Sequence, residues 1–450
     1  MKNNKMLIII GVVLLNVIVV FMFAQSLLGK TNVYDQTLID ARALVEQNLC
    51  SKAIDKYNEA IVIEDTLETR IEMLKAYEKG LEIGEFTNPY SIFVEIDTIV
   101  DMYKTDLAVY ETACDIFLKY EKYEECANLL MQARDLKVTS EKIEEARAKV
   151  RYQFMKVYAM YTEVMPTFDG MITAVSENEY SFLSDEASPD LSGGFVYATS
   201  FSEGYAFVQT SDAEGNKLSF VINKDGQRQF YVENAESSSG VGKAMDADKQ
   251  TILLLTCKAG DTYDYYDMNG NKVLSGYSFG GRFRNNVAAV KDADGKWRII
   301  NGVGEAVSDK VFEDVILNEF DECAPKGHII AKENGAYHIY DINLNQVGDF
   351  SCEFAKAFVD DYAAFRNGEL WGFVGADGSV IIEPQYEDAK SFSNLMGAVK
   401  TGDGWSLINP ANEVVVNEIY EDVSYLNDKG ICFVKFDGFW SYLDMYYTGK

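Results

Sequence analysis

Hydrophobic and polar residues follow two different periods along the chain, and the period changes near residue 166. Over residues 33–165 apolar residues recur three and four positions apart, the spacing of one face of an α-helix. From residue 168 onward, short alternating apolar stretches are separated by turns that contain Gly, Asn or Asp, which is typical of β-hairpins. The pattern therefore predicts an α + β multidomain protein, helical over 33–165 and all-β over 168–450.

Residues 6–28 have no period, because nearly every residue there is apolar. The run is 23 residues long and uncharged, and about 20 apolar residues are enough to cross a bilayer as a helix. Lys2 and Lys5 precede it, so the positive-inside tendency predicts a cytoplasmic tail over 1–5 and an extracytoplasmic remainder. The alternatives are a cleaved signal peptide and a buried soluble helix. The length of the run, and Met22 at the best cleavage position, favour an uncleaved, single-pass signal-anchor in the cell membrane.

The helical region repeats one arrangement of small and apolar side chains at positions i, i+4 and i+7. It occurs at Ala53, Tyr57 and Ala60, and again at Cys126, Leu130 and Ala133. These residues resemble tetratricopeptide repeats, whose helix pairs recur about every 34 residues. The resemblance implies a stalk of helical hairpins that binds peptides or packs against partner helices, and a generic helical bundle is the alternative. Residues 141–165 are predicted to form a last capping helix, which Pro166 ends.

Three segments of the β region share one skeleton, at 283–315, 358–389 and 392–423. Each has an alternating strand, a turn, a strand that begins near Trp, a polar turn, and a last strand that ends in an aromatic residue followed by Glu-Asp. Weaker copies fit the same phase, and Tyr180 is the candidate for an eighth copy. The aromatic positions of the other copies are Phe220, Tyr265, Trp297, Tyr337, Trp371, Trp405 and Trp440.

The turns, the spacing and the Trp beside Gly in ELWGFVGADGSVIIEPQYED resemble the WG-repeat family of bacterial proteins. The resemblance extends over 168–450, is most specific over 358–423, and is weakest over 168–282, which lacks Trp. It implies an all-β repeat array, propeller-like and of six to eight blades, with no catalytic residues defined for the family. The repeat aromatics listed above would then be structural, each offering a large apolar body to the next repeat.

Ring closure is expected because one hairpin repeat cannot bury its apolar face alone. An open array must cap its ends, whereas a closed ring leaves only short, protected edges. The ten residues after Trp440 contain no evident cap. This favours a closed propeller whose last blade is completed by strands from 168–197, and an open β array is the alternative.

Composition limits which classes of partner the chain can bind and which side-chain chemistry it can support. The chain has 41 Lys and Arg against 71 Asp and Glu, a net charge of −30, which disfavours nucleic acid or anionic lipid as the main partner. Its seven cysteines are an odd number without a Cys-x-x-Cys pair, so buried thiols are favoured over disulfides or a redox role. Only two histidines, His328 and His338, are available for metal or pH-sensing chemistry, and surface or half-buried histidines without such a role are the simpler interpretation.

Two recurrent acidic motifs also have structural interpretations. Asp-Gly and Asn-Gly turns at 223–226, 267–270, 292–295 and 375–378 suggest calcium, but they are too short for its six to eight oxygen ligands and are preferred hairpin turns. Glu-Asp pairs at 313–314, 387–388 and 421–422 recur in phase, which indicates turn capping or a solvated rim rather than acid–base catalysis. We therefore expect no catalytic, cofactor-binding or metal-binding residues, and no cofactor.

These features together predict a membrane-anchored, extracytoplasmic binding or scaffold protein. Its β-repeat head would bind a protein, a peptide or a cell-envelope polymer, with exposed aromatics such as Tyr386 and Tyr420 on the binding faces. The alternative is a propeller-type hydrolase or lyase that acts on envelope glycans. Carboxylates or histidines that break the repeat symmetry at the ring centre would distinguish the two.

Overall fold

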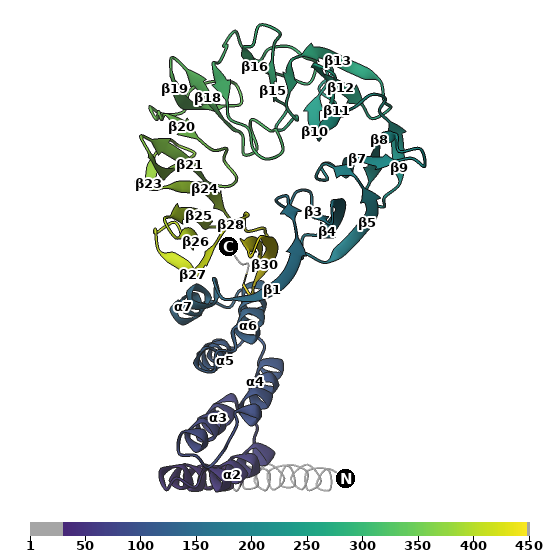
Figure 1. Cartoon of the computed structure of the whole chain (residues 1–450). Helices are drawn as coiled ribbons and strands as arrows, with labels where there is room; N and C mark the ends of the chain where they lie inside the picture. The colour runs from purple at the N-terminus through teal and green to yellow at the C-terminus, as the bar shows by residue number, and fades with distance from the viewer. Residues whose placement is uncertain (1–29, 448–450) are drawn as a thin grey trace, which may run out of the picture. The chain divides into compact units, whose positions relative to one another are not determined.

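The structure, a computed structural model, describes residues 30–447 and divides the chain into two compact units, Met1–Val150 and Arg151–Lys450 (Figure 1). The predicted tail over 1–5 and membrane segment over 6–28 lie outside the described residues. Within the described part of the chain, no helix is both long and apolar enough to cross a membrane.

The first unit is helical, as predicted. A helix over 30–46 is followed by α2 (Cys50–Ile63), α3 (Leu67–Glu82), α4 (Tyr90–Met102), α5 (Leu107–Lys119), α6 (Tyr123–Asp135) and α7 (Glu141–Val150). Successive helices pack as hairpins: α3 contacts both α2 and α4, and α7 contacts both α5 and α6. The start of α2 is capped by the Glu85 carboxylate, which accepts hydrogen bonds from the backbone N–H groups of Cys50 at 2.8 Å and Ser51 at 3.0 Å.

Both predicted stripes of small and apolar residues face the core of this unit. Ala53, Tyr57 and Ala60 on α2 pack with Met73 of α3 in one cluster. The equivalent residues on α6 are also buried, namely Cys126, Leu130 and Ala133. The period of the sequence therefore identified the buried face of each helix.

The helix predicted over 141–165 is wrong in its second half. Helix α7 ends at Val150, and residues Phe154–Tyr161 form strand β1. The β-branched and aromatic residues of this segment suit a strand, and antiparallel pairing with a distant strand, β30, decides the outcome. A long-range partner of this kind leaves no trace in local periodicity.

The second unit consists of eight antiparallel sheets, here called blades 1 to 8, arranged around a centre (Figure 1). Blade 1 contains β2 (Glu163–Val164), β3 (Met171–Ser176), β4 (Glu179–Ser184) and β5 (Pro189–Phe195). Blade 2 contains β6 (Tyr197–Ala198), β7 (Tyr205–Ser211), β8 (Lys217–Asn223) and β9 (Arg228–Tyr231). Blade 3 contains β10 (Ser237–Met245), β11 (Thr251–Ala259), β12 (Thr262–Asp267) and β13 (Lys272–Tyr277). Blades 4 and 5 contain β14 (Phe279–Gly280), β15 (Ala288–Lys291), β16 (Trp297–Ile300); and β17 (Asp314–Val315), β18 (His328–Glu333), β19 (Ala336–Asp341). Blade 6 contains β20 (Phe354–Ala355), β21 (Tyr362–Asn367), β22 (Leu370–Gly375) and β23 (Val380–Tyr386). Blade 7 contains β24 (Asp388–Ser393), β25 (Met396–Thr401), β26 (Gly404–Ile408) and β27 (Val414–Tyr420). Blade 8 contains β28 (Asp422–Val423), β29 (Ile431–Phe436) and β30 (Phe439–Met445).

Strand β1 closes the ring. It adds to β30 as the outer strand of blade 8, so the first strand of this unit completes the last sheet. The predicted closed propeller is confirmed at eight blades, but the prediction that strands from 168–197 complete the last blade is wrong. Those residues instead form most of blade 1 and part of blade 2, because the closing strand lies in the segment that had been assigned to a helix.

The repeat aromatics occupy the third strand of every blade, including Tyr180 in blade 1. In the four-stranded blades this position pairs with a residue of the fourth strand that is usually aromatic, as in Trp371 with Tyr386 and Trp405 with Tyr420. Blades 4 and 5 have three strands, and there Trp297 and Tyr337 form isolated bridges to Phe312 and Cys352. Blade 3 is shifted: Tyr263 holds the register position, opposite Tyr277, while the predicted Tyr265 lies two residues further on.

Candidate binding site

The loops between the first and second strands of the blades meet around the centre of the ring. In most blades this loop is short, for example the six residues 356–361 between β20 and β21. In blade 5 it is twice as long and spans residues 316–327 between β17 and β18, a segment we call the plug loop. The repeat is therefore extended at this loop, at the ring centre.

The plug loop reaches blades on the far side of the ring. The Phe320 ring packs on Phe168 of blade 1, with centroids 4.6 Å apart. The Glu319 carboxylate accepts a hydrogen bond from the Tyr425 hydroxyl of blade 8 at 2.7 Å. Blade 1 is opposite blade 5 in an eight-bladed ring, so these contacts carry the loop across the centre.

A buried ion pair holds the plug loop to blade 4. Glu322 of the plug loop lies 2.9 Å from Arg282, and both side chains are only 1% exposed. The Arg282 guanidinium also stacks over Phe168 at 4.2 Å and over Phe320 at 4.9 Å. Burial lowers the pKa of Arg282, and the Glu322 carboxylate opposes that shift.

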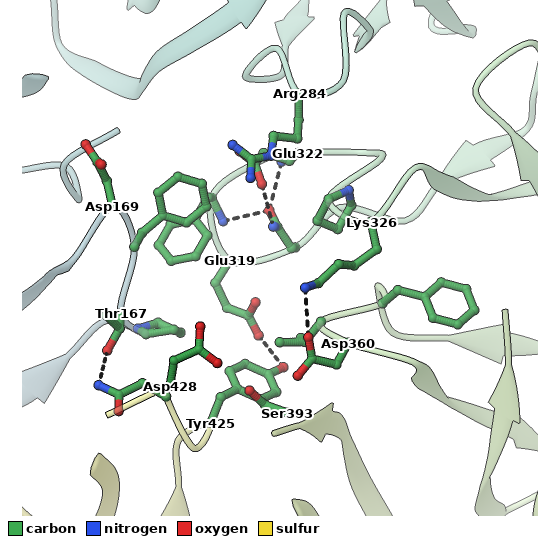
Figure 2. Close-up of a pocket in the computed structure, with 18 of the residues that line it drawn as sticks. Thr167, Asp169, Arg284, Glu319, Glu322, Lys326, Asp360, Ser393, Tyr425 and Asp428 are labelled. Carbon is green, nitrogen blue, oxygen red and sulfur yellow. Dashed lines mark hydrogen bonds and ion pairs between the residues drawn. The ribbon is translucent and has the colours of Figure 1, made fainter. Parts of the chain in front are cut away.

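A cavity of about 450 Å³ lies beside the plug loop. Seven carboxylate side chains and only two cationic ones line it, together with Phe168, Phe320, Phe358 and Tyr425. Figure 2 shows Glu319 near the middle of this cavity, pointing toward Tyr425. The acidic lining residues are Asp169, Asp185, Glu203, Glu319, Glu322, Asp360 and Asp428.

Several of these carboxylates are neutralised within the ring. Asp360 pairs with Lys326 at 2.7 Å, and Asp169 pairs with Lys224 at 3.1 Å. Glu203 lies 3.6 Å from Arg284. Among the described residues, Asp185, Glu319 and Asp428 form no ion pair. Enclosure by the loops raises the pKa of Tyr425, and the neighbouring Glu319 adds to the effect.

A second cavity, of about 650 Å³, lies next to the first. Its walls include Lys243, Met245 and Thr251 from the β10–β11 hairpin of blade 3, and Glu203 and Arg284 are common to both cavities. Strands β10 and β11 are the longest of their blade, at nine residues each. The two places where the repeat is extended therefore border the same region of the ring.

The structure places the predicted repeat aromatics in the cores of the blades rather than in the cavities. Trp297, Trp371, Trp405, Tyr337 and Tyr265 are buried, and Trp440 and Phe220 are partly buried. Their setting is consistent with the structural role that the sequence analysis expected. The expectation that Tyr386 and Tyr420 are exposed fails for Tyr420, which is 2% exposed because it packs against Trp405 across the sheet, and Tyr386 is partly buried.

The acidic pairs that recur along the sequence cap turns, as predicted. Glu313 accepts a hydrogen bond from the Gly335 N–H in the next hairpin at 2.9 Å, and Glu421 does the same for Gly438. Two of the Asp partners link neighbouring blades, Asp388 with Lys356 at 2.8 Å and Asp422 with Lys390 at 2.6 Å, whereas Asp314 accepts a hydrogen bond from Tyr337 of its own blade. These carboxylates therefore have structural partners.

The polar turns that suggested calcium are also self-contained. The Asp267 carboxylate accepts hydrogen bonds from the backbone N–H groups of Asn269 and Asn271 within its own turn. Asp377 accepts one from the Ser379 N–H. Within residues 30–447, no group of three or more His, Cys, Asp or Glu residues is placed to hold a metal ion.

The two histidines do not face each other. His338 is opposite Ala331 and His328 is opposite Asp341 in the β18–β19 hairpin. Their ring Nδ1 atoms contact different backbone carbonyls, those of Phe350 and Lys326. All seven cysteines are buried and free, as the sequence indicated.

The cavity residues are not predicted from the repeat pattern, although the spacing of the repeats is irregular in this part of the chain. The aromatic positions are 34 or 35 residues apart from Tyr337 onward, but 40 from Tyr180 to Phe220, 45 from Phe220 to Tyr265 and 40 from Trp297 to Tyr337. Two of these three longer intervals contain the long β10–β11 hairpin and the plug loop. Irregular spacing therefore pointed to this half of the ring without singling out the site.

Comparison with protein families identifies the repeat. The family described as the WG containing repeat matches residues 265–297 and 371–405, so the C-terminal region carries WG repeats, as predicted. No such match supports the tetratricopeptide resemblance, which stays a prediction. No curated protein sequence matches the chain.

Solved structures that match the chain include two WD40 domains and a eukaryotic initiation factor. A WD40 domain of SCAP from fission yeast is 7% identical, with a TM-score of 0.40, over 66% of this chain and 95% of that one. A eukaryotic initiation factor is 11% identical, with a TM-score of 0.38, over 62% of this chain and 83% of that one. The Pan2 WD40 domain of Neurospora crassa is 9% identical, with a TM-score of 0.35, over 64% and 89%. Similarity at this level carries no information on function.

Proposed function

We propose that the protein is a non-catalytic binding protein that holds a polypeptide partner on one face of its ring. This face, called the loop face, presents the loops between first and second strands and between third and fourth strands. The observation that carries the proposal is the convergence of the plug loop and the long β10–β11 hairpin on two adjoining cavities there. In a repeat protein, a functional site is expected where one repeat differs in structure from the others.

The chemistry of the cavities also favours binding. No histidine or cysteine lines either cavity in the described part of the chain. Most polar lining groups already have partners that fix loops to one another, as Asp360 does through the Asn394 N–H at 2.6 Å. Such groups build a rigid surface, which lowers the entropic cost of binding a partner.

The setting that we propose is the outer side of a cell membrane. The uncharged run over 6–28, preceded by Lys2 and Lys5, supports a single-pass anchor with the ring outside. The helical unit would supply a second surface for peptides or partner helices. The ring would then bind a protein, a peptide or an envelope polymer at the cell surface.

A second candidate function is hydrolysis or elimination on an envelope glycan. The observation in its favour is the pair of carboxylates Glu319 and Asp428, which lack cationic partners among the described residues and share a cavity with Tyr425. Glycoside hydrolysis needs two carboxylates at a set separation across the scissile bond. Release of sugar products by the purified protein, abolished by Glu319→Gln, would establish it.

Site-specific cross-linking in the cells that make the protein tests the binding proposal. A photoreactive amino acid at Val359, in the first cavity, should give a discrete adduct with one partner protein. The same amino acid at Asp403, in the exposed β25–β26 turn, should give none, because that turn lies on the opposite face. Equal adducts at both positions, or none at Val359, would contradict the proposal.

A further inference from the structure

The two cavities on the loop face adjoin. Glu203 and Arg284 line both, so the first cavity of about 450 Å³ borders the second of about 650 Å³ at these residues. Together they exceed what one side chain fills, and they suit a stretch of several residues. We call the two adjoining cavities the groove.

The charge of the groove indicates which kind of polypeptide segment would bind there. The first cavity has five more carboxylates than cations among its lining side chains, and three of its carboxylates form no ion pair with any described residue: Asp185, Glu319 and Asp428. The whole chain carries a net charge of −30, so the field around the groove also attracts cations. Acidic polymers would be repelled, and cationic partners would be attracted most strongly to the first cavity.

The aromatic walls already hold cationic groups. The Arg284 guanidinium stacks on Phe168 at 5.3 Å, next to the buried Arg282 on the same ring. Phe320 and Tyr425, both partly exposed, offer further ring surface in the same cavity. An arriving lysine or arginine would therefore find both a carboxylate and an aromatic ring, a combination that favours cations.

One buried acceptor beside the first cavity has no donor. The Asn394 side chain is 4% exposed, and its Oδ1 atom has no hydrogen-bond partner among the described residues. Asn394 is bonded to two lining residues, since its N–H donates to Asp360 and its Nδ2 donates to the Asn427 carbonyl at 3.1 Å. Asn394 does not itself line the cavity, but its bonds to Asp360 and Asn427 hold two lining residues in place.

We propose that the groove binds an extended, lysine- or arginine-rich segment of the partner polypeptide, with one cationic side chain held by Glu319 and Asp428 beside Tyr425. This inference rests on the proposed binding function and names the chemistry of the partner. The segment is extended because the groove runs from the centre of the ring toward blade 3, over the boundary formed by Glu203 and Arg284.

A titration of the purified full chain with labelled peptides tests the inference. The probe is a decapeptide of alternating lysine and serine, and the matched peptide has glutamate in place of lysine. The variant is Glu319→Gln with Asp428→Asn, which keeps the size of both side chains and leaves an amide oxygen at position 319 to accept from the Tyr425 hydroxyl. The control is Asp261→Asn with Asp403→Asn, which makes the same change in net charge at exposed turns on the opposite face.

Wild type and control should bind the lysine peptide with equal affinity, and the cavity variant should bind it about tenfold more weakly. The glutamate peptide should not bind. Equal losses in the variant and the control would show only a diffuse charge effect and would overturn the inference. Equal competition by spermine, a free polyamine, would also overturn it, because a polypeptide would then not be required.

The peptide titration and the cross-link at Val359 together distinguish failure of the cationic-segment inference from failure of the proposed binding function. If the lysine peptide fails to bind wild type while the cross-link at Val359 still forms, the partner is held by other chemistry and only the inference falls. If the cross-link at Val359 also fails, the proposed function falls with it.

Discussion

At the scale of single residues, the aromatic position of the repeat determines how neighbouring strands fit. Trp371 is 6% exposed, packs edge-on to Phe354 with centroids 6.0 Å apart, and lies under Lys356 at 4.7 Å. The glycine after it is needed because a Cβ at Gly372 would lie 2.4 Å from the Ile382 carbonyl oxygen. In this blade the Trp fills the space between strands, and the Gly after it allows the neighbouring strand to approach closely.

Truncation of these aromatics should destabilise the ring. Trp371→Ala and Trp405→Ala should each lower the free energy of unfolding by about 3–5 kcal/mol, because each leaves a cavity in a blade core. Asp377→Ala, in an exposed turn, should cost much less than either tryptophan variant. Urea denaturation followed by tryptophan fluorescence or circular dichroism measures all three, and similar losses for Asp377 and the tryptophans would contradict the packing account.

The buried pair under the plug loop gives a second prediction at this scale. Glu322→Gln should destabilise the ring by about 3–5 kcal/mol, because it leaves the Arg282 charge buried without a counter-charge. The double variant Arg282→Met with Glu322→Leu should recover much of the loss, since neither charge remains. A double-mutant cycle with no coupling between the two positions would show that the pair is not a unit.

At the scale of elements, the sequence predicted what depends on local pattern. The helical stripes at Ala53 and Cys126, the recurrent aromatic position and the capping role of Glu313 all follow from spacing and residue type. The aromatic was expected on the second strand of each repeat and lies on the third, because a first strand such as β20, only two residues long, was not predicted. Strand β1 could not be predicted in this way, because its pairing with β30 joins residues nearly 300 positions apart. The cavity residues were missed for a related reason: Glu319 and Tyr425 meet only when the ring closes.

The closing strand provides the prediction at this scale. The Ala159 N–H donates to the Ser441 hydroxyl of β30 at 2.9 Å, so Ala159→Pro removes a bond that joins the first and last strands. Hydrogen exchange should then speed up in β28, β29 and β30 and remain slow in blades 3 to 6, because closure is lost only locally. Ala159→Ser, which keeps the N–H, is the control. Unchanged exchange in blade 8 would contradict the role of β1 in closure.

At the scale of the whole molecule, the account combines a proposed anchor, a helical unit and a plugged ring. A protease added to intact cells should degrade the ring, because the lysines before residue 6 are expected to stay in the cytoplasm. A cytoplasmic protein serves as the control for cell integrity. Protection of the ring in intact cells, with cleavage after permeabilisation, would reverse the proposed orientation.

The central claim is that the loop face binds a partner and does not convert it. Native mass spectrometry of the full chain with the partner captured at Val359 measures both properties in one experiment. The account predicts a complex whose mass is the sum of the two proteins, and a partner whose mass is unchanged after release. A partner that is cleaved or modified by wild type, and left intact by Glu319→Gln in a folded protein, would contradict it.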